Sequence, residues 1–211
     1  MVQMKIASNV RWQGFGTTVA ARSALKQQSP AIVWMTGLSG SGKSTLANVL
    51  EQELTSRSRH AYVLDGDNLR HGLNRDLGFS DKDRVENMRR TSETARLLAD
   101  AGLIVIVALI SPFRAERALA RAVATPFRFF EVHVDAPLYL CEMRDPKDLY
   151  RKARCGLIPD FTGIASIYEP PGDPDVHIDT ARIEPDEAVA QLLEMLEKHS
   201  VLSAQSVTLK L

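Results

Sequence analysis

The chain has 211 residues, of which 45% are hydrophobic and 25% are charged, with 12 glycines and 10 prolines. This profile is that of an ordinary globular domain, and it excludes collagen-like, disordered and disulfide-stapled proteins. The 26 basic residues balance 26 acidic residues, so the formal net charge is zero. A general binder of nucleic acids or anionic membranes would carry a basic surplus, so we expect neither as a partner.

Short β-branched runs alternate along the chain with longer segments whose apolar residues recur at helical spacing. The predicted strands cover 31–36, 61–65, 103–110, 127–134 and 175–179, and the predicted helices cover 45–56, 81–100, 114–124, 136–143 and 185–198. Strands separated by helices predict an α/β fold, a doubly wound parallel sheet of about five strands with helices on both faces. In the helix 81–100, the residues expected to face the core are Val85, Met88, Leu97 and Leu98.

Two segments fit this alternation badly and suggest the domain organisation. Residues 1–30 are expected to form a partly ordered N-terminal arm, and residues 31–211 a single domain. Residues 144–172 are charged and punctuated by proline and glycine, which is typical of a mobile lid.

The cysteines and the hydropathy indicate the compartment. Cys141 and Cys155 show no CxxC spacing, so we expect two free thiols, with a regulatory disulfide as the alternative. The N-terminal stretch has no long apolar run, and the longest apolar segment, 103–110, is too short to span a bilayer. These features predict a cytoplasmic protein without a membrane partner.

The segment after the first predicted strand matches the phosphate-binding pattern G-x-x-x-x-G-K-[ST]. Its glycines permit a close approach of the backbone to phosphate oxygens, and the start of the next helix supplies N–H groups. The lysine reaches the β- and γ-phosphates and the following hydroxyl binds Mg²⁺. The pattern predicts a P-loop NTPase-type domain that binds ATP through Gly37, Leu38, Ser39, Gly40, Ser41, Gly42, Lys43, Ser44 and Thr45.

Acidic residues follow the second predicted strand rather than the third. Asp65 and Asp67 stand at a strand end that should face the ligand crevice, and they are the best candidates for binding Mg²⁺ with Ser44 or for acting as a general base. An Asp-Gly turn that only caps a helix is the alternative. We therefore expect Mg²⁺ as the cofactor and Lys43, Asp65 and Asp67 as catalytic residues.

Basic residues near these acids indicate the charge of the second substrate. Arg70 follows the acids, and Arg84 and Asn87 share one face of the next helix, whereas Arg89 points elsewhere and is expected in solvent. A pair of guanidinium groups in an acceptor pocket implies an anionic acceptor. These residues alone predict a P-loop kinase that acts on a small anionic acceptor. A non-catalytic nucleotide-binding module is the alternative from another class.

Longer blocks extend the pattern over nearly the whole chain. They are GLSGSGKST at 37–45, LDGDNLRHGLNRDLGFS at 64–80, DRVENMRR at 83–90, ISPFRAER at 110–117, RDPKDLYRKAR at 144–154 and FTGIASIYEPP at 161–171. In this order and spacing the sequence resembles the adenylylsulfate kinase (APS kinase) family, which transfers phosphate from ATP to the 3′-hydroxyl of adenosine 5′-phosphosulfate (APS). The resemblance implies ATP and APS as substrates, a role in sulfate assimilation and a homodimer.

The resemblance also implies roles at matching positions. The acceptor would be held by Asp67, Arg70, Phe79, Arg84, Asn87, Ile110, Ser111, Lys152, Phe161 and Thr162, with Phe79 stacked on its adenine. Arg144 would lie towards the base of ATP. Ser111 has two interpretations, because some members are described with a phosphoserine at this position, whereas direct in-line transfer needs only a contact residue here. The sequence shows no adjacent base to activate Ser111, which favours direct transfer.

Two features qualify the pattern. Asp148 stands where the family usually has glycine, and this adds a charge to the lid. The charge is also segregated, because residues 169–197 hold nine acids and one base, a net charge of −8, which leaves +8 on the rest of the chain. The basic surplus includes the phosphate loop, the region 70–90 and the lid, where two anionic nucleotides would bind.

Overall fold

The computed structural model describes residues 9–202. The first eight residues of the predicted arm and the last nine of the predicted domain lie outside the described residues. The strands are β1 (Ala31–Thr36), β2 (Ala61–Asp65), β3 (Ile104–Ala108), β4 (Arg128–Asp135) and β5 (Val176–Asp179). The helices are α1 (Val19–Lys26), α2 (Lys43–Ser56), α3 (Gly66–His71), α4 (Asp81–Asp100), α5 (Arg114–Ala124), α6 (Leu138–Arg144), α7 (Leu149–Arg154) and α8 (Pro185–Lys198).

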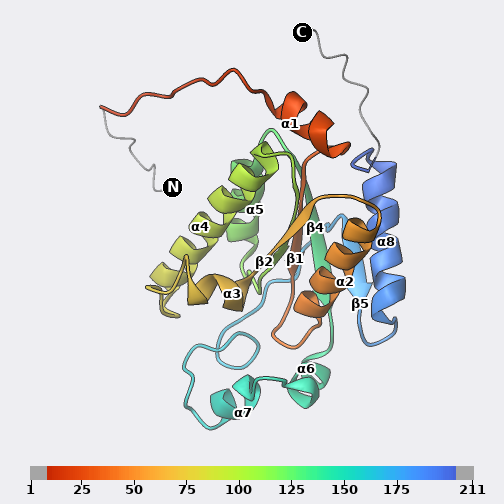
Figure 1. Ribbon diagram of the computed structural model, residues 1–211. Coiled ribbons are helices and arrows are strands. Elements are labelled where there is room, and N and C mark those ends of the chain that lie inside the picture. The colour runs from red at the N-terminus through yellow and green to blue at the C-terminus, as the bar shows by residue number, and fades with distance from the viewer. Residues whose placement is uncertain (1–8, 203–211) are drawn as a thin grey trace.

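The five strands form one parallel sheet in the order β2-β3-β1-β4-β5. Helices α2 and α8 cover one face and α4 and α5 the other, as Figure 1 shows, so the predicted doubly wound α/β fold is confirmed. The central strand β1 is buried along its whole length because both of its faces are covered.

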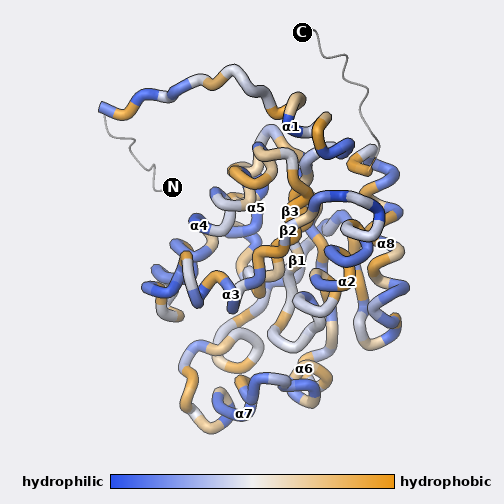
Figure 2. Tube along the Cα trace, in the orientation of Figure 1, coloured by the Kyte–Doolittle hydropathy of each residue, from blue (hydrophilic) through white to orange (hydrophobic). Residues whose placement is uncertain are grey.

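Alternation along β1 divides the hydrophobic core into two layers. Ala31, Val33 and Met35 pack with the apolar residues of α2 and α8. Ile32 and Trp34 point to the opposite face and pack beneath α4 and α5. The hydrophobic colour in Figure 2 is correspondingly concentrated on the strands at the centre of the molecule. This double burial explains why β1 and β3 are continuously apolar rather than alternating.

Helix α4 spans the predicted range, but its predicted inward face is partly wrong. Met88 is buried and Leu98 packs against the core, whereas Val85 is 51% exposed and Leu97 is 60% exposed. The buried face of this 20-residue helix is a line of residues at intervals of three and four, Met88, Ser92, Ala95 and Ala99, most of which are small. Apolar side chains on the outer face of a long helix cannot be told from core residues by spacing alone.

Three short helices are absent from the predicted elements. Helix α1 lies within the predicted arm at the far end of the sheet from α6 and α7 (Figure 1), where Arg22 forms an ion pair with Asp100. Helix α3 directly follows β2, and α7 lies within residues 144–172. Each has six to eight residues, too few to show a helical period in the sequence.

Residues 144–172 pack around a small apolar cluster of their own. Tyr150 and Phe161 meet edge to face with ring centroids 5.0 Å apart, beside Cys141 and Ala153. Leu38 of the phosphate loop packs against this cluster. The segment therefore sits over the carboxyl ends of the strands (Figure 1), and its mobility stays a prediction.

Candidate active site

The phosphate loop connects the end of β1 to the first turn of α2. Its shape requires glycine, because a Cβ at Gly37 would lie 2.2 Å from the Val134 carbonyl oxygen, and Gly40 has a φ of 74°. Gly42 stands at the N-cap of α2 without a side-chain cap, so the first N–H groups of this 14-residue helix point into the loop. Such N–H groups, together with the helix dipole, favour an anion at this place.

Lys43 is buried within the loop. Its ammonium group donates to the carbonyl oxygens of Gly37 and Leu38 at 2.9 and 2.6 Å. Burial lowers the pKa of Lys43 to about 8, and the nearby carboxylates of Asp65 and Asp67 offset the effect only in part. Burial thus disfavours the charged form of Lys43, and an anionic group bound nearby would stabilise that form.

Two carboxylates lie next to the loop. The Asp65 side chain accepts a hydrogen bond from Ser44 Oγ at 2.6 Å, and its other oxygen caps α3 by accepting from Asp67 N at 3.0 Å. Asp67 is more exposed and forms an ion pair with Lys147. Asp65 therefore caps a helix, as the alternative interpretation of the Asp-Gly turn predicts, and its side chain also faces the phosphate loop, as a Mg²⁺ ligand would.

The oxygen donors suit a hard divalent cation. Mg²⁺ binds oxygen at about 2.0–2.1 Å in octahedral geometry, which places neighbouring ligand atoms about 2.9 Å apart. Ser44 Oγ and Asp65 Oδ2 are already close to this separation at 2.6 Å. Asp67 stands two residues further along at the start of α3. The separation of Ser44 Oγ and Asp65 Oδ2 thus fits the ion, and the role of Asp67 as a third ligand stays a prediction.

The predicted acceptor residues Arg70, Phe79 and Arg84 lie on α3, in the connection between α3 and α4, and in the first turn of α4. The Arg70 guanidinium stacks 4.3 Å from the centroid of the Phe79 ring and donates to the carbonyls of Leu77 and Gly78. Arg84 donates to the Phe79 carbonyl at 3.0 Å. The Phe79 ring is 63% exposed, so one of its faces is available for stacking while Arg70 covers the other.

Arg84 also joins α4 to the lid. It donates to Thr162 Oγ1 at 3.1 Å and to the Asp160 carbonyl at 2.7 Å. The side chain of Asn87, one turn along α4, is buried and accepts from Asn74 Nδ2 at 2.9 Å. Thr162 is therefore brought beside Arg84, whereas the Phe161 ring packs in the apolar cluster against Tyr150 and Lys152 is exposed on α7.

Arg89 and Arg90, further along α4, have structural contacts. Arg89 is paired with Glu86 at 2.7 Å rather than standing alone in solvent. Arg90 also contacts Glu86 and reaches Asp76, which attaches the turn after α3 to α4. The spacing argument that separated Arg89 from Arg84 and Asn87 is consistent with this arrangement.

Ile110 and Ser111 follow β3, next to the phosphate loop. The Ile110 carbonyl accepts from Thr36 Oγ1 at 2.8 Å and from Gly37 N at 3.4 Å. Ser111 is buried with a φ of 39°, and its hydroxyl accepts from the Trp34 indole at 3.2 Å and donates to the Leu109 carbonyl at 3.4 Å. Neither an indole N–H nor a peptide carbonyl can act as a general base for this hydroxyl.

Sequence reasoning missed several residues that organise the site. Arg117, only 2% exposed, contacts Glu131 at 2.6 Å and donates to the carbonyls of Ser111 and Glu169 at 2.7 Å each. Thr180, just beyond β5, donates to the Ser41 carbonyl at 2.9 Å and accepts from Arg144 at 3.0 Å. Arg117 ends the block at 110–117, whereas Glu131 and Thr180 lie outside the blocks, and nothing in a single sequence shows that these residues meet their partners.

The lid and the phosphate loop are connected directly. Tyr150 Oη donates to the Ser39 carbonyl at 2.8 Å, and Arg144 reaches the Gly40 carbonyl at 3.3 Å. Lys147, which pairs with Asp67, belongs to the same segment.

Among residues 9–202, no helix is long and apolar enough to cross a membrane.

This geometry can be compared with known proteins. The family model of adenylylsulphate kinase matches residues 29–179. The chain belongs to the adenylylsulphate kinase family. It is 52% identical over 197 residues to the adenylyl-sulfate kinase of Marinobacter nauticus, an alignment that covers 93% of this chain and 99% of the relative.

Two further relatives frame the comparison. The bifunctional enzyme NodQ of Rhizobium sp. strain BR816 is 53% identical over 196 residues. This alignment covers 93% of the present chain but only 31% of the length of NodQ. The structure of the Mycobacterium tuberculosis APS kinase CysC in complex with AMPPNP and APS is 52% identical, with a TM-score of 0.78. That comparison covers 81% of this chain and 99% of CysC.

Proposed function

We propose that this chain transfers the γ-phosphoryl group of ATP to the 3′-hydroxyl of APS, giving 3′-phosphoadenosine 5′-phosphosulfate and ADP. One observation carries the proposal. A phosphate loop, two carboxylates and an arginine-rich acceptor region meet at the carboxyl ends of one sheet. The 52% identity with CysC, whose structure holds an ATP analogue and APS, supports the choice of acceptor.

The phosphate side of the reaction rests on the loop. In this proposal the N–H groups of residues 37–45 and the Lys43 ammonium bind the β- and γ-phosphates and stabilise the charge of the transition state. Ser44, Asp65 and Asp67 would hold Mg²⁺, which supplies charge neutralisation between the phosphates when bound. Arg144, which contacts the Gly40 carbonyl and Thr180, would lie towards the base of ATP.

The acceptor side uses the opposite wall of the site. Arg70, Arg84 and Asn87 would hold the phosphosulfate and adenosine, with the open face of Phe79 stacked on adenine. Asp67 would accept the proton of the 3′-hydroxyl as the oxygen attacks. The remaining proposed contacts come from the end of β3 and from the lid: Ile110, Ser111, Lys152, Phe161 and Thr162.

Ser111 serves as a contact residue in this proposal, and transfer is direct. Its hydroxyl is buried between the Trp34 indole and the Leu109 carbonyl, an arrangement that does not activate a nucleophile. Rapid quench of the enzyme with labelled ATP and no APS tests the point. Labelled protein that disappears in a Ser111→Ala variant would instead establish a phosphoserine intermediate.

The decisive experiment incubates the protein with Mg·ATP and APS and measures the 3′-phosphorylated product by chromatography. We expect ADP and product in equal amounts, and no ADP above background when APS is omitted. Turnover of another anionic acceptor, with APS left unchanged, would overturn the assignment. Omission of Mg²⁺ should abolish product formation, because the phosphate charges would no longer be neutralised.

The assembly and the location of the enzyme complete the proposal. By the resemblance to its family we propose a homodimer that acts in sulfate assimilation in the cytoplasm. Sedimentation at several protein concentrations measures the assembly directly. A single species with the mass of one chain at all concentrations would contradict the homodimer.

A further inference from the structure

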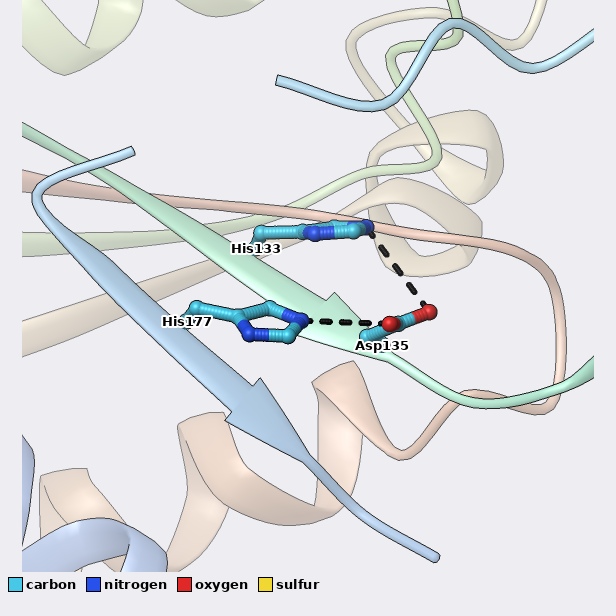
Figure 3. Close-up of side chains that lie close together, drawn as sticks. All are labelled: His133, Asp135 and His177. Atoms are coloured by element: carbon cyan, nitrogen blue, oxygen red, sulfur yellow. Dashed lines mark hydrogen bonds and ion pairs between the residues drawn. The ribbon is translucent and has the colours of Figure 1, made fainter. Parts of the chain in front are cut away.

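Three potential metal ligands lie together at the ends of β4 and β5, apart from the residues proposed to bind Mg²⁺. They are His133, Asp135 and His177, shown in Figure 3. One ligand atom from each residue lies within 4.8 Å of the others. None of the three belongs to the phosphate loop, to the carboxylates that follow β2 or to the acceptor residues.

The strand register explains why these side chains meet. His133 and Asp135 are two residues apart on β4, so both point to the same face of the sheet. His177 is the direct partner of His133 in the parallel pairing of β4 and β5. Side chains in register on neighbouring parallel strands stand about 4.8 Å apart, and the two imidazole rings stack with centroids 5.1 Å apart.

The distances are close to those of a coordinated ion. The shortest nitrogen–oxygen separations to Asp135 are 3.1 Å for His177 Nε2 and 4.0 Å for His133 Nε2. Zinc binds such atoms at about 2.0–2.2 Å, which places tetrahedral ligands about 3.3–3.5 Å apart. The 3.1 Å contact is to Asp135 Oδ2 and the 4.0 Å contact is to Oδ1, so side-chain rotation is needed to bring one ligand atom from each residue around a single ion.

The surroundings differ on the two sides of the cluster. His133 is 8% exposed and its ring stacks on Tyr168 at 5.9 Å, which limits its movement. His177 is exposed, so an ion has a path from solvent. His133 and Asp135 also line a cavity of about 460 Å³ together with residues 163–168, and this cavity has room for water next to the two side chains.

We propose that His133, Asp135 and His177 form a three-ligand site for a divalent transition metal, with zinc as its representative. Two imidazoles and one carboxylate favour Zn²⁺, Co²⁺ or Ni²⁺ over Mg²⁺, which prefers oxygen ligands alone. The open position makes the site resemble three-ligand zinc sites rather than closed four-ligand ones. The proposal is independent of the proposed function.

Zinc titration of the full chain without an affinity tag tests the proposal. The parent protein carries Cys155→Ser, because Cys155 is an exposed thiol that could itself bind zinc. Excess Mg²⁺ is present throughout to occupy the oxygen site near Ser44. We expect about one zinc per chain by calorimetry and by elemental analysis after dialysis, and an intense visible absorption when Co²⁺ replaces zinc.

Variants distinguish zinc binding at this cluster from nonspecific zinc binding elsewhere on the surface. His177→Gln should weaken zinc binding at least about tenfold, by comparison with the loss caused by removal of a supporting residue. His71→Gln, an exposed histidine outside the cluster, should bind zinc like the parent. Zinc should also raise the melting temperature of the parent and of His71→Gln, and should raise that of His177→Gln less at the same zinc concentration.

Two results would overturn the proposal. One is a parent protein that takes up no stoichiometric zinc. The other is unchanged affinity in both His177→Gln and His133→Gln after circular dichroism has shown that the variants are folded. Because His177 is exposed at the sheet edge, its variant keeps the test meaningful even if His133→Gln does not fold.

Discussion

At the scale of single residues, Lys43 combines two opposing effects. Burial in the phosphate loop penalises its charge, while the nearby carboxylates of Asp65 and Asp67 and two loop carbonyls favour it. The balance leaves its pKa at about 8, well below its ordinary value of 10.5. A group in this state responds strongly to an anionic ligand, because phosphate oxygens stabilise the charged form.

Replacement of Lys43 by alanine should lower turnover at least about 100-fold, because one preorganised donor to the transition state is lost. The measurement is the rate of product formation at saturating Mg·ATP and APS. Lys152→Ala, on the exposed surface of α7, serves as the comparison, and its loss should be smaller. Turnover close to that of the wild type in a folded Lys43→Ala protein would contradict the role given to the loop.

The lowered pKa of Lys43 also predicts a proton linked to ATP binding. With a pKa of about 8, about half of the Lys43 amine is neutral at pH 8 and most of it is neutral at pH 9 before ATP binds. Bound phosphates raise this pKa, so binding should take up about half a proton at pH 8 and nearly one proton at pH 9. Near pH 6.5 the amine is already charged and this uptake should vanish. Calorimetry in buffers of different ionisation enthalpy measures the effect, and Lys43→Met should remove the part that appears at high pH.

At the scale of secondary-structure elements, α4 and the lid are connected through one side chain. Arg84 extends from the first turn of α4 to Thr162 and to the carbonyl of Asp160. Lys147 makes a second connection, to Asp67 at the start of α3. These contacts use residues proposed to bind substrates, so ligand binding and the position of the lid should depend on each other.

Arg84→Ala should weaken APS binding far more than ATP binding, because its guanidinium lies on the acceptor side. Arg89→Ala is the matched control on the same helix, since Arg89 pairs with Glu86 instead. Separate dissociation constants for the two nucleotides, measured by calorimetry, decide the matter. Equal losses for both ligands would show that Arg84 supports the whole site rather than the acceptor pocket.

The start of α7 contains a strained position. Asp148, at the N-cap of α7, has a φ of 54°, a conformation that costs most side chains about 1–2 kcal/mol. Asp148→Gly removes this cost, against about 0.5–1 kcal/mol of extra entropy lost on folding, so the free energy of unfolding should rise by up to about 1 kcal/mol. Asp148→Ala should lower it, because alanine suits this conformation less well than aspartate. Chemical denaturation compares the three proteins, and a less stable glycine variant would refute the account.

At the scale of the whole molecule, the ligand-binding edge is held together by contacts between distant segments. Arg117 joins α5 to the residue range that follows β3 and to the last part of the lid, through the carbonyls of Ser111 and Glu169. The buried guanidinium also pairs with Glu131 on β4. One side chain thus links three parts of the chain that are well separated in sequence.

Arg117→Met should destabilise the fold by about 3–5 kcal/mol, because it leaves a shielded carboxylate and two carbonyls without their donor. Arg117→Lys should fold, since an ammonium can still reach Glu131, but it cannot serve both carbonyls. We expect faster hydrogen exchange in residues 168–170 of this variant, with little change in α2. Exchange that is equal to the wild type in both regions would show that Arg117 does not anchor the lid.

The sequence by itself determined the order of the main strands and helices, the phosphate loop and the family. These features are local, because β-branched runs, helical spacing and short motifs depend on neighbouring residues. The same reasoning failed at Val85 and Leu97, which lie on the outer face of α4. Local spacing indicates that a helix has apolar residues on one face, but the strands and helices that pack against it decide which of those residues are buried.

Only the tertiary structure decided which distant side chains meet. The register of β4 and β5 brings His177 beside His133, and the lid places Lys147 against Asp67. The sequence likewise shows that acidic and basic residues are concentrated in different segments, but only the folded structure shows which of these residues form ion pairs. The physical reason is that register, layer packing and loop closure join residues tens of positions apart, and no local pattern in a single sequence specifies those pairings.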